Sequence, residues 1–101
     1  MSARAHEMAK DLIAFHCPGC RYDHAVGVHG RKIPGEDGTM NTWQWNDSLE
    51  QPTFTPSLLV FKNTPSARCH SFVTNGRIRF LQDCFHTLKG QTVELPDWEG
   101  W

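Results

Sequence analysis

The sequence predicts a small, mostly β domain, and three observations lead to that prediction. Short apolar runs of strand length recur along the chain, Asn75-Gly76 separates two of them, and the four cysteines are distributed among them. An Asn-Gly pair between two such runs is a strong signal for a two-residue hairpin turn. A chain of 101 residues with 39 % hydrophobic content suits one domain with a thin core. We expect a single domain over 1–101, with its core over about 12–98, built as a small antiparallel zinc-ribbon-like β fold.

The N-terminal segment carries a different pattern. Ala5, Met8 and Leu12 recur at spacings of three and four residues, which is typical of one face of a helix. Charged residues occupy most of the positions between them. We expect residues 4–12 to form either a short N-terminal helix or a frayed end.

A first hairpin is predicted around the cysteine turn Cys17-Pro18-Gly19-Cys20. The apolar run 12–17 leads into this turn, and the run 24–28 leads out of it. Proline fixes one backbone angle and glycine permits a positive φ, so the two residues suit a tight turn. The two cysteines should therefore lie together at the tip of the hairpin.

The middle of the chain alternates between loops and short strands. Residues 29–41 are rich in glycine and charge and show no period, which indicates a loop. Trp43 and Trp45 fall on one face of a short strand, and we expect them to pack in the core. Two prolines four residues apart then favour an extended, irregular segment. We therefore predict a loop at 29–41, a strand at 42–46, irregular chain at 48–57, and strands at 57–63 and 91–95.

The clearest element is a second hairpin whose turn is Asn75-Gly76. Side chains alternate between the two faces of a strand, so residues can be assigned to faces by counting outward from this turn. In a regular hairpin, Cys69 and Cys84 then lie on the same face as diagonal neighbours. His86 shares that face if the second strand continues so far.

The four cysteines indicate one metal site. Two thiolates in a C-x-x-C turn can both point at one zinc ion, whereas a redox role would want a βαβ context that this chain does not offer. A full tetrahedral shell would leave no position for substrate, so the ion would be structural. We predict a Zn²⁺ site made of Cys17, Cys20, Cys69 and Cys84, with His86 or His24 in place of Cys84 as the alternative.

A second group of residues would suit catalysis. Two histidines and a carboxylate can hold a catalytic zinc ion with a bound water, which makes Glu50, His70 and His86 the candidate catalytic residues. A regular hairpin places His70 and His86 on opposite faces, and a bulge near Asp83 would bring them to the same face. The structural alternative is a hydrogen bond from His70 to Asp83 across the hairpin.

Composition and motifs argue against several other classes. The net charge of −1 offers no basic excess for a nucleic-acid backbone. Neither a secretory signal nor an apolar run of about 20 residues is visible, so we expect a cytoplasmic protein with reduced thiols and no membrane partner. No nucleophile elbow or phosphate loop appears, and Ser57 and Ser71 lack an evident base.

Five motifs in a fixed order resemble a known family. They are FHCPGC, WQWN, PTFTPSLLV, RCHSFVTNGRIRFLQDCFH and LKGQTVELPDW, which together cover roughly residues 12–98. The chain resembles a family of small phage and prophage proteins, the domain of unknown function 6527, some of whose members are mislabelled ammonia monooxygenase. The resemblance implies zinc binding. Some relatives lie beside bacterial ubiquitin-like conjugation genes and are suspected of being metal-dependent peptidases. Carried over by position, the family motifs correspond to Glu50, Cys69, His70, Asp83 and His86.

Two hypotheses follow. The first is a zinc-stabilised phage or prophage protein that binds a host or phage protein. The second is a minimal zinc-dependent hydrolase, peptidase-like, that uses His70, His86 and Glu50. Because the resemblance implies Thr or Ser in many relatives at the position of Cys84, it favours His86 or another residue as the fourth ligand of the structural site. The sequence alone does not choose between an enzyme and a binding protein.

Overall fold

The computed structural model describes residues 3–35 and 37–98, and every helix or strand element in these ranges is a β-strand. The strands pair in antiparallel sheets, so the prediction of a small, mostly β, antiparallel fold is confirmed. A three-stranded sheet has the order β1-β2-β3, a five-stranded sheet has the order β10-β9-β8-β7-β6, and β4 pairs with β5. The strands are β1 (His6–Ala9), β2 (Leu12–Cys17), β3 (Tyr22–Gly27), β4 (Ile33–Pro34), β5 (Met40–Asn41), β6 (Gln44–Trp45), β7 (Phe54–Val60), β8 (Cys69–Thr74), β9 (Arg77–Phe80) and β10 (Thr92–Glu94).

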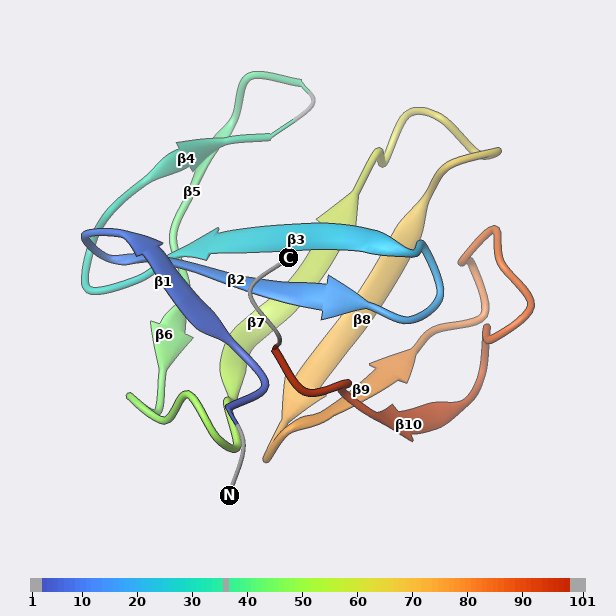
Figure 1. Cartoon of the computed structure of the whole chain (residues 1–101). Helices are drawn as coiled ribbons and strands as arrows, with labels where there is room; N and C mark the ends of the chain where they lie inside the picture. The colour runs from blue at the N-terminus through green and yellow to red at the C-terminus, as the bar shows by residue number, and fades with distance from the viewer. Residues whose placement is uncertain (1–2, 36, 99–101) are drawn as a thin grey trace.

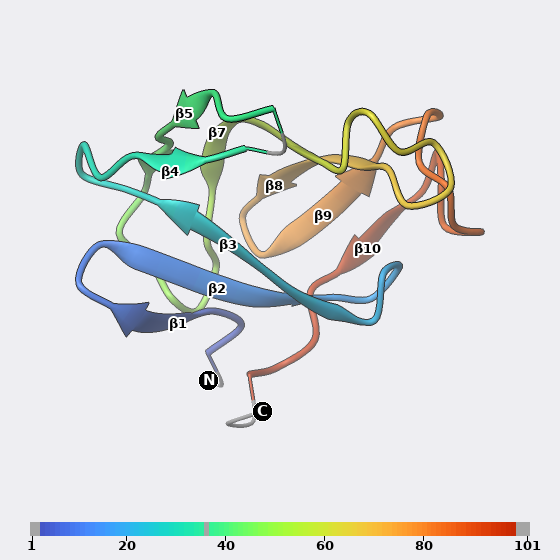
Figure 2. The same ribbon diagram turned by 90° about the horizontal axis from the view of Figure 1, so that it is seen from above.

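The two larger sheets face each other and enclose the core (Figure 1). Seen from above, the three-stranded sheet forms one layer and strands β7–β10 form the other, while the β4–β5 hairpin extends to one side (Figure 2). Phe15 of β2 stacks on Phe54 of β7 with ring centroids 5.9 Å apart, which joins the layers. Both rings are buried, and burying a side chain of this size contributes roughly 1.5–3 kcal/mol.

The first hairpin forms where the sequence predicts it. β2 pairs with β3 in regular antiparallel register up to Cys17, which lies opposite Tyr22. The turn is closed by the backbone N–H of Arg21, which donates to the Cys17 carbonyl at 2.8 Å. Cys17 is buried and Cys20 is half-buried, so the hairpin tip presents its sulfur atoms to the protein interior.

The helix considered for residues 4–12 is wrong, because this segment forms β1 and turns directly into β2. Ala9 pairs with Leu12 across a tight turn in which Asp11 has a φ of 60°. Met8 is 56 % exposed, so the helix-like apolar spacing does not correspond to a packed face. Within the described ranges there is also no helix long and apolar enough to cross a membrane.

The region between the two hairpins is more regular than the sequence predicts. The loop expected at 29–41 contains the β4–β5 hairpin, in which Ile33 pairs with Asn41. Strand β7 begins at Phe54 and includes Pro56, within the segment expected to be irregular. Pro56 is exposed and lies where the pairing of β7 with β8 is interrupted, which is where a residue without an N–H is tolerated.

The second hairpin is confirmed at its turn and differs from the prediction at its far end. Asn75 and Gly76 have φ values of 50° and 79°, the two positive angles that a type I′ turn requires. The pairing of β8 with β9 ends at Phe80. Cys84 and His86 therefore belong to the following loop, and the regular register used to place them does not extend so far.

Candidate active site and metal centre

Strand β8 supplies residues to two different clusters because its side chains alternate between the faces of the sheet. Its inward residues are buried, whereas its outward residues are half-buried or exposed. The inward set is Cys69, Ser71 and Val73, and the outward set is His70, Phe72 and Thr74.

A serine, a histidine and a carboxylate line up on the outer face. The Ser57 hydroxyl lies 3.1 Å from Nε2 of His70, and the other ring nitrogen of His70, Nδ1, lies 3.2 Å from the Asp83 carboxylate. A carboxylate beside Nδ1 favours the tautomer that carries the proton there, so Nε2 is left to accept a hydrogen bond from Ser57. This is the order of nucleophile, base and orienting carboxylate found in Ser-His-Asp hydrolases.

An irregular stretch of β7 brings Ser57 to this face. Before Leu58, β7 contains two more residues than β8 between successive paired positions, which makes a β-bulge. From Leu58 onward the pairing is regular, and Leu59 lies opposite His70. Because Ser57 precedes Leu59 by two residues, it is the diagonal neighbour of His70 on the same face.

The triad is open to solvent and held by contacts to the backbone. The His70 side chain is 24 % exposed and that of Asp83 is 43 % exposed, so molecules in solution can reach both side chains directly. The Trp43 indole N–H donates to the Ser57 carbonyl at 3.3 Å. The backbone of His70 in β8 is held by Cys84, whose Sγ accepts a hydrogen bond from the His70 N–H at 3.3 Å and donates one to the His70 carbonyl at 3.1 Å.

Three cysteines and one histidine converge on the inner side of β8. Their ligand atoms all lie within 4.8 Å of one another, close to the roughly 3.7 Å that separates two ligands in a tetrahedral zinc site. The residues come from the β2–β3 hairpin, the first position of β8 and the loop after β9. Three sulfurs and one imidazole nitrogen are a common closed ligand set for structural zinc. The four residues are Cys17, Cys20, Cys69 and His86.

The sulfur atoms of Cys17, Cys20 and Cys69 lie so close together that each changes the pKa of the others. Hydrogen bonds from Cys20 and Cys69 hold the pKa of the Cys17 thiol well below its usual value. The contact with Cys17 raises the pKa of Cys20 to about 12, and contacts with Cys17 and Cys20 raise the pKa of Cys69. A metal ion binds thiolates and releases their protons, so an ion bound here would take the place of protons on these sulfur atoms.

His86 is positioned as a ligand by tight packing. Its Nε2 lies 3.6 Å from Cys69 Sγ, and its ring packs edge-on against Phe80 with centroids 4.4 Å apart. Burial lowers the pKa of His86, which favours the neutral ring that a metal requires. A Cβ placed on Gly19 would lie 2.3 Å from the imidazole, so glycine leaves the room that His86 occupies. Both the donor set and the packing fit a zinc ion.

Cys84 lies apart from this cluster. The chain turns after Phe80, so the loop directs the Cys84 sulfur to the backbone of His70 and brings His86 to the other sulfurs. His24, the second alternative, is buried and helps to lower the pKa of Cys17, but it is not one of the four converging residues. The structure thus joins three of the predicted cysteines with His86.

The residues considered for a catalytic zinc ion are not brought together. His70 contacts Ser57 on the outer face, while His86 lies with the cysteines on the inner side. Glu50 lies in the exposed loop between β6 and β7. The hydrogen bond from His70 to Asp83, the structural alternative in the sequence prediction, is present.

Ser57 is a candidate site residue that the sequence reasoning considered and set aside, because no base for it was evident. Motif searches look for a sharp strand-to-helix elbow, whereas Ser57 lies in a bulged strand directly after Pro56. The alternation of side chains between the two faces of a strand could have indicated that Ser57 and His70 lie together. Pairing the run 57–63 with the strand that begins at Cys69 would have placed Ser57 and His70 on one face.

Fold and triad together define a small β protein with the side-chain arrangement of a serine hydrolase. The sequence model of one family, described as bacterial ubiquitination-like system serine protease (BubE), matches residues 2–81. Because this range is most of the chain, the protein belongs to that family. Ser57 and His70 lie within the matched range, and Asp83 and His86 follow shortly after it. No curated protein and no solved structure matches the chain.

Proposed function

We propose that this protein is a serine peptidase in which Ser57 is the nucleophile, His70 the general base and Asp83 the residue that orients the imidazole. The observation that carries the proposal is the continuous pair of contacts, 3.1 Å from Ser57 to His70 and 3.2 Å from His70 to Asp83. The family description, which names a serine protease, supports it. A serine nucleophile takes the place of the zinc-bound water considered from the sequence.

The first half of the reaction forms an ester on the protein. Ser57 Oγ attacks the carbonyl carbon of the scissile peptide bond, and its proton passes to His70 Nε2. Asp83 accepts the hydrogen bond from Nδ1 and stabilises the charged imidazolium. The carbon–nitrogen bond then breaks, and His70 gives the proton to the leaving amine.

A water molecule completes the cycle. It attacks the carbonyl carbon of the ester while His70 Nε2 takes its proton. The bond between that carbon and Ser57 Oγ breaks, and His70 returns a proton to the serine oxygen. One water is consumed for each peptide bond cleaved.

In the same proposal, Zn²⁺ is structural. Three cysteines and His86 would complete a tetrahedral shell, so no coordination position is left for substrate. The ion would fasten the tip of the β2–β3 hairpin to Cys69, next to His70, and to the loop that carries Asp83. A domain with a thin core gains stability from such a cross-link.

The cellular location and the substrate of the peptidase are also proposed here. All four cysteines are free, which suits the reducing cytoplasm of a bacterial cell. The substrate would be a host, phage or prophage protein, and the family description associates the relatives with a ubiquitination-like system. The protein-binding role expected from the sequence then becomes the recognition step of the peptidase.

The test is labelling by a fluorophosphonate probe, which reacts with activated serine hydroxyls without needing the natural substrate. The native protein should be labelled on Ser57, located by mass spectrometry, and Ser57→Ala should abolish labelling. Ser71→Ala is a matched control, because the Ser71 hydroxyl is buried and has no hydrogen-bond partner among the described residues. Labelling that persists in Ser57→Ala, or fails in the folded, metal-loaded native protein, would overturn the proposal.

A further inference from the structure

Two hollows flank the triad on the outer surface. The first, the Trp43 hollow, has a volume of about 490 Å³ and lies between the β4–β5 hairpin and β7. Ser57 itself contributes to its lining, so any group bound there lies directly beside the nucleophile. Other residues that line the Trp43 hollow are Ile33, Pro34, Trp43, Leu59 and Phe61.

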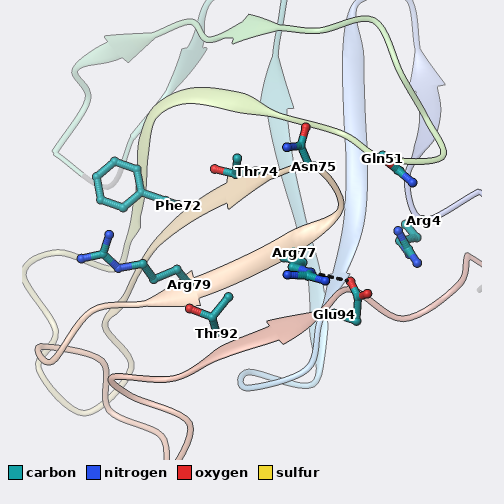
Figure 3. A pocket seen from close by; sticks show the side chains of 9 residues that line it. All are labelled: Arg4, Gln51, Phe72, Thr74, Asn75, Arg77, Arg79, Thr92 and Glu94. Carbon is teal, nitrogen blue, oxygen red and sulfur yellow. Dashed lines mark ion pairs between the residues drawn. The ribbon is translucent and has the colours of Figure 1, made fainter.

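The second hollow lies over strands β8, β9 and β10 (Figure 3). It has a volume of about 630 Å³, and we call it the arginine hollow. Figure 3 shows Arg77 and Arg79 on β9, Phe72 on the neighbouring strand, and Arg4 on the far side of the hairpin turn. Thr92 and Glu94 of β10 also line it.

One row of residues across the sheet connects this hollow to Ser57. Phe72 is the β8 residue that faces the bulge containing Ser57, and Arg79 pairs with Phe72 on the next strand. Neighbouring strands lie about 4.8 Å apart, so Arg79 is about 10 Å from the strand that carries the nucleophile. Because the sheet order is β10-β9-β8-β7-β6, the arginine hollow and the Trp43 hollow lie on opposite sides of Ser57.

The arginine hollow carries unbalanced positive charge. Its lining contains Arg4, Arg77 and Arg79 but a single carboxylate, Glu94, which pairs with Arg77 at 3.5 Å. The Arg79 guanidinium lies over the Phe72 ring at 5.8 Å, a contact that positions the cation without neutralising it. The whole chain has a net charge of −1, so this surplus is local. Guanidinium groups presented in this way favour carboxylates.

The Trp43 hollow has a different character. The ion pair at its edge, Asp37 with Lys62 at 2.9 Å, is balanced within itself, and Lys62 holds the pKa of Asp37 below its usual range. The wall beside Ser57 is formed by aromatic and aliphatic side chains such as Trp43 and Leu59. A hollow of this kind suits an apolar side chain.

We infer that the peptidase selects polypeptides with an apolar side chain beside the scissile bond, bound in the Trp43 hollow, and an acidic side chain on the other side of that bond, bound by Arg77 and Arg79. The inference rests on the proposed function. An extended chain that crosses the strands advances about 3.3 Å per residue, so the roughly 10 Å between the strand of Ser57 and Arg79 corresponds to about three residues. The acidic residue therefore lies about three positions from the cleaved bond.

The test uses the full-length, metal-loaded protein and a pooled library of synthetic peptides of defined sequence, with cleavage sites identified by mass spectrometry. We expect Asp or Glu to be enriched about three positions from the cleaved bond. Arg79→Glu should lower kcat/KM for an acidic peptide roughly five- to tenfold and raise it for the matched peptide with Lys at that position, the size expected when a surface charge pair is reversed.

Lys10→Glu provides the matched control. It makes the same change of charge in the β1–β2 turn, at an exposed residue that lines neither hollow. Its kcat/KM should stay close to that of the native protein with both peptides. Equal behaviour of Lys10→Glu and Arg79→Glu, or cleavage without acidic enrichment, would overturn the inference.

Failure of the inference and failure of the proposed function give different results. If the probe labels Ser57 but the protein cleaves peptides without a preference for acidic residues, the inference is wrong and the proposed serine peptidase function still stands. If Ser57 is not labelled, the proposed function is wrong, and the arginine hollow is then tested by fluorescence anisotropy of the same two peptides with Ser57→Ala. Tighter binding of the acidic peptide supports the hollow as an acid-binding site, and equal binding overturns it.

Discussion

Cys69 and His70 are neighbours in the chain but belong to regions of opposite character. Cys69 is fully buried among the converging sulfur atoms, whereas His70 lies on the outer face against Ser57. The loop after β9 repeats this division, because His86 joins the buried cluster and Asp83 joins the triad. Both regions share β8 and the loop after β9, but the buried cluster adds the β2–β3 hairpin whereas the triad adds Ser57 of β7.

Because of this difference, we expect the buried cluster to determine the stability of the fold and the exposed triad to determine the reaction. A buried, closed set of ligands stabilises the fold when it binds metal, since the binding free energy becomes folding free energy. An exposed His–Asp pair contributes only about 0–1 kcal/mol, so the triad adds little to stability. Changes in the triad should therefore leave the fold intact, whereas loss of the metal should disturb both regions.

The largest expected effect is loss of the fold when the metal centre is broken. A domain of this size has a total stability of about 5–15 kcal/mol, and a structural zinc site contributes much of it in small domains. We expect Cys69→Ser, or chelation of the native protein, to abolish the cooperative thermal transition. Circular dichroism and metal content of the purified protein measure this outcome.

Cys84→Ser is the control that tests which residue is the fourth ligand. A serine hydroxyl can keep both hydrogen bonds to the His70 backbone, and Cys84 lies outside the cluster of four. Its zinc content should stay at one per chain with a similar melting temperature. A Cys84→Ser protein that loses its zinc, with His86→Ala retaining it, would restore the four-sulfur site predicted from the sequence.

The next effect is on catalysis alone. Asp83→Asn keeps the shape of the side chain but no longer fixes the His70 proton on Nδ1, so acylation should slow roughly 10³-fold. This is below the largest effects known for triads because the Asp83 side chain is 43 % exposed. The rate of fluorophosphonate labelling measures the loss, and the melting temperature should stay within about 2 °C of the native value.

Asp23→Asn makes the same change at a comparable contact in the other sheet. Asp23 pairs with Nδ1 of His16 at 3.0 Å across the β2–β3 hairpin. Its labelling rate should equal that of the native protein. Equal slowing in both variants would show that the effect is a general one of charge and would remove Asp83 from the triad.

Local patterns in the sequence predicted the parts of the fold that depend on neighbouring residues. The Asn75-Gly76 pair predicted a hairpin turn because these residue types tolerate the two positive φ angles that such a turn needs, and the turn is present. The cysteine turn likewise gave the β2–β3 hairpin. The helix at 4–12 was wrong because apolar spacing was weighed without the turn at Asp11 that pairs β1 with β2.

The site required long-range information that no local pattern contains. Counting alternate residues outward from the turn put Cys69 and Cys84 on one face. The count was extended past Phe80, where β9 ends, so it wrongly gave Cys84 the place beside Cys69 that His86 occupies. Ser57 was set aside for lack of a base because its partner His70 is on another strand and because a bulge separates Ser57 from the preceding paired residue. Bulges and strand ends change which side chains meet, and the sequence marks them weakly.

The smallest of these effects tests how closely the metal centre is packed. Gly19→Ala would place a Cβ 2.3 Å from the His86 ring, and no positive φ is involved at this position, so the change acts on space alone. We expect zinc affinity to fall roughly 10- to 100-fold, a size typical of displacing the support of a ligand, as measured by competition with a chelator. Gly35→Ala, in the exposed turn of the β4–β5 hairpin, is the control and should bind zinc like the native protein. Unchanged affinity in Gly19→Ala would mean that zinc binding does not depend on the His86 ring packed against this position, and His86 would then be removed from the ligand set.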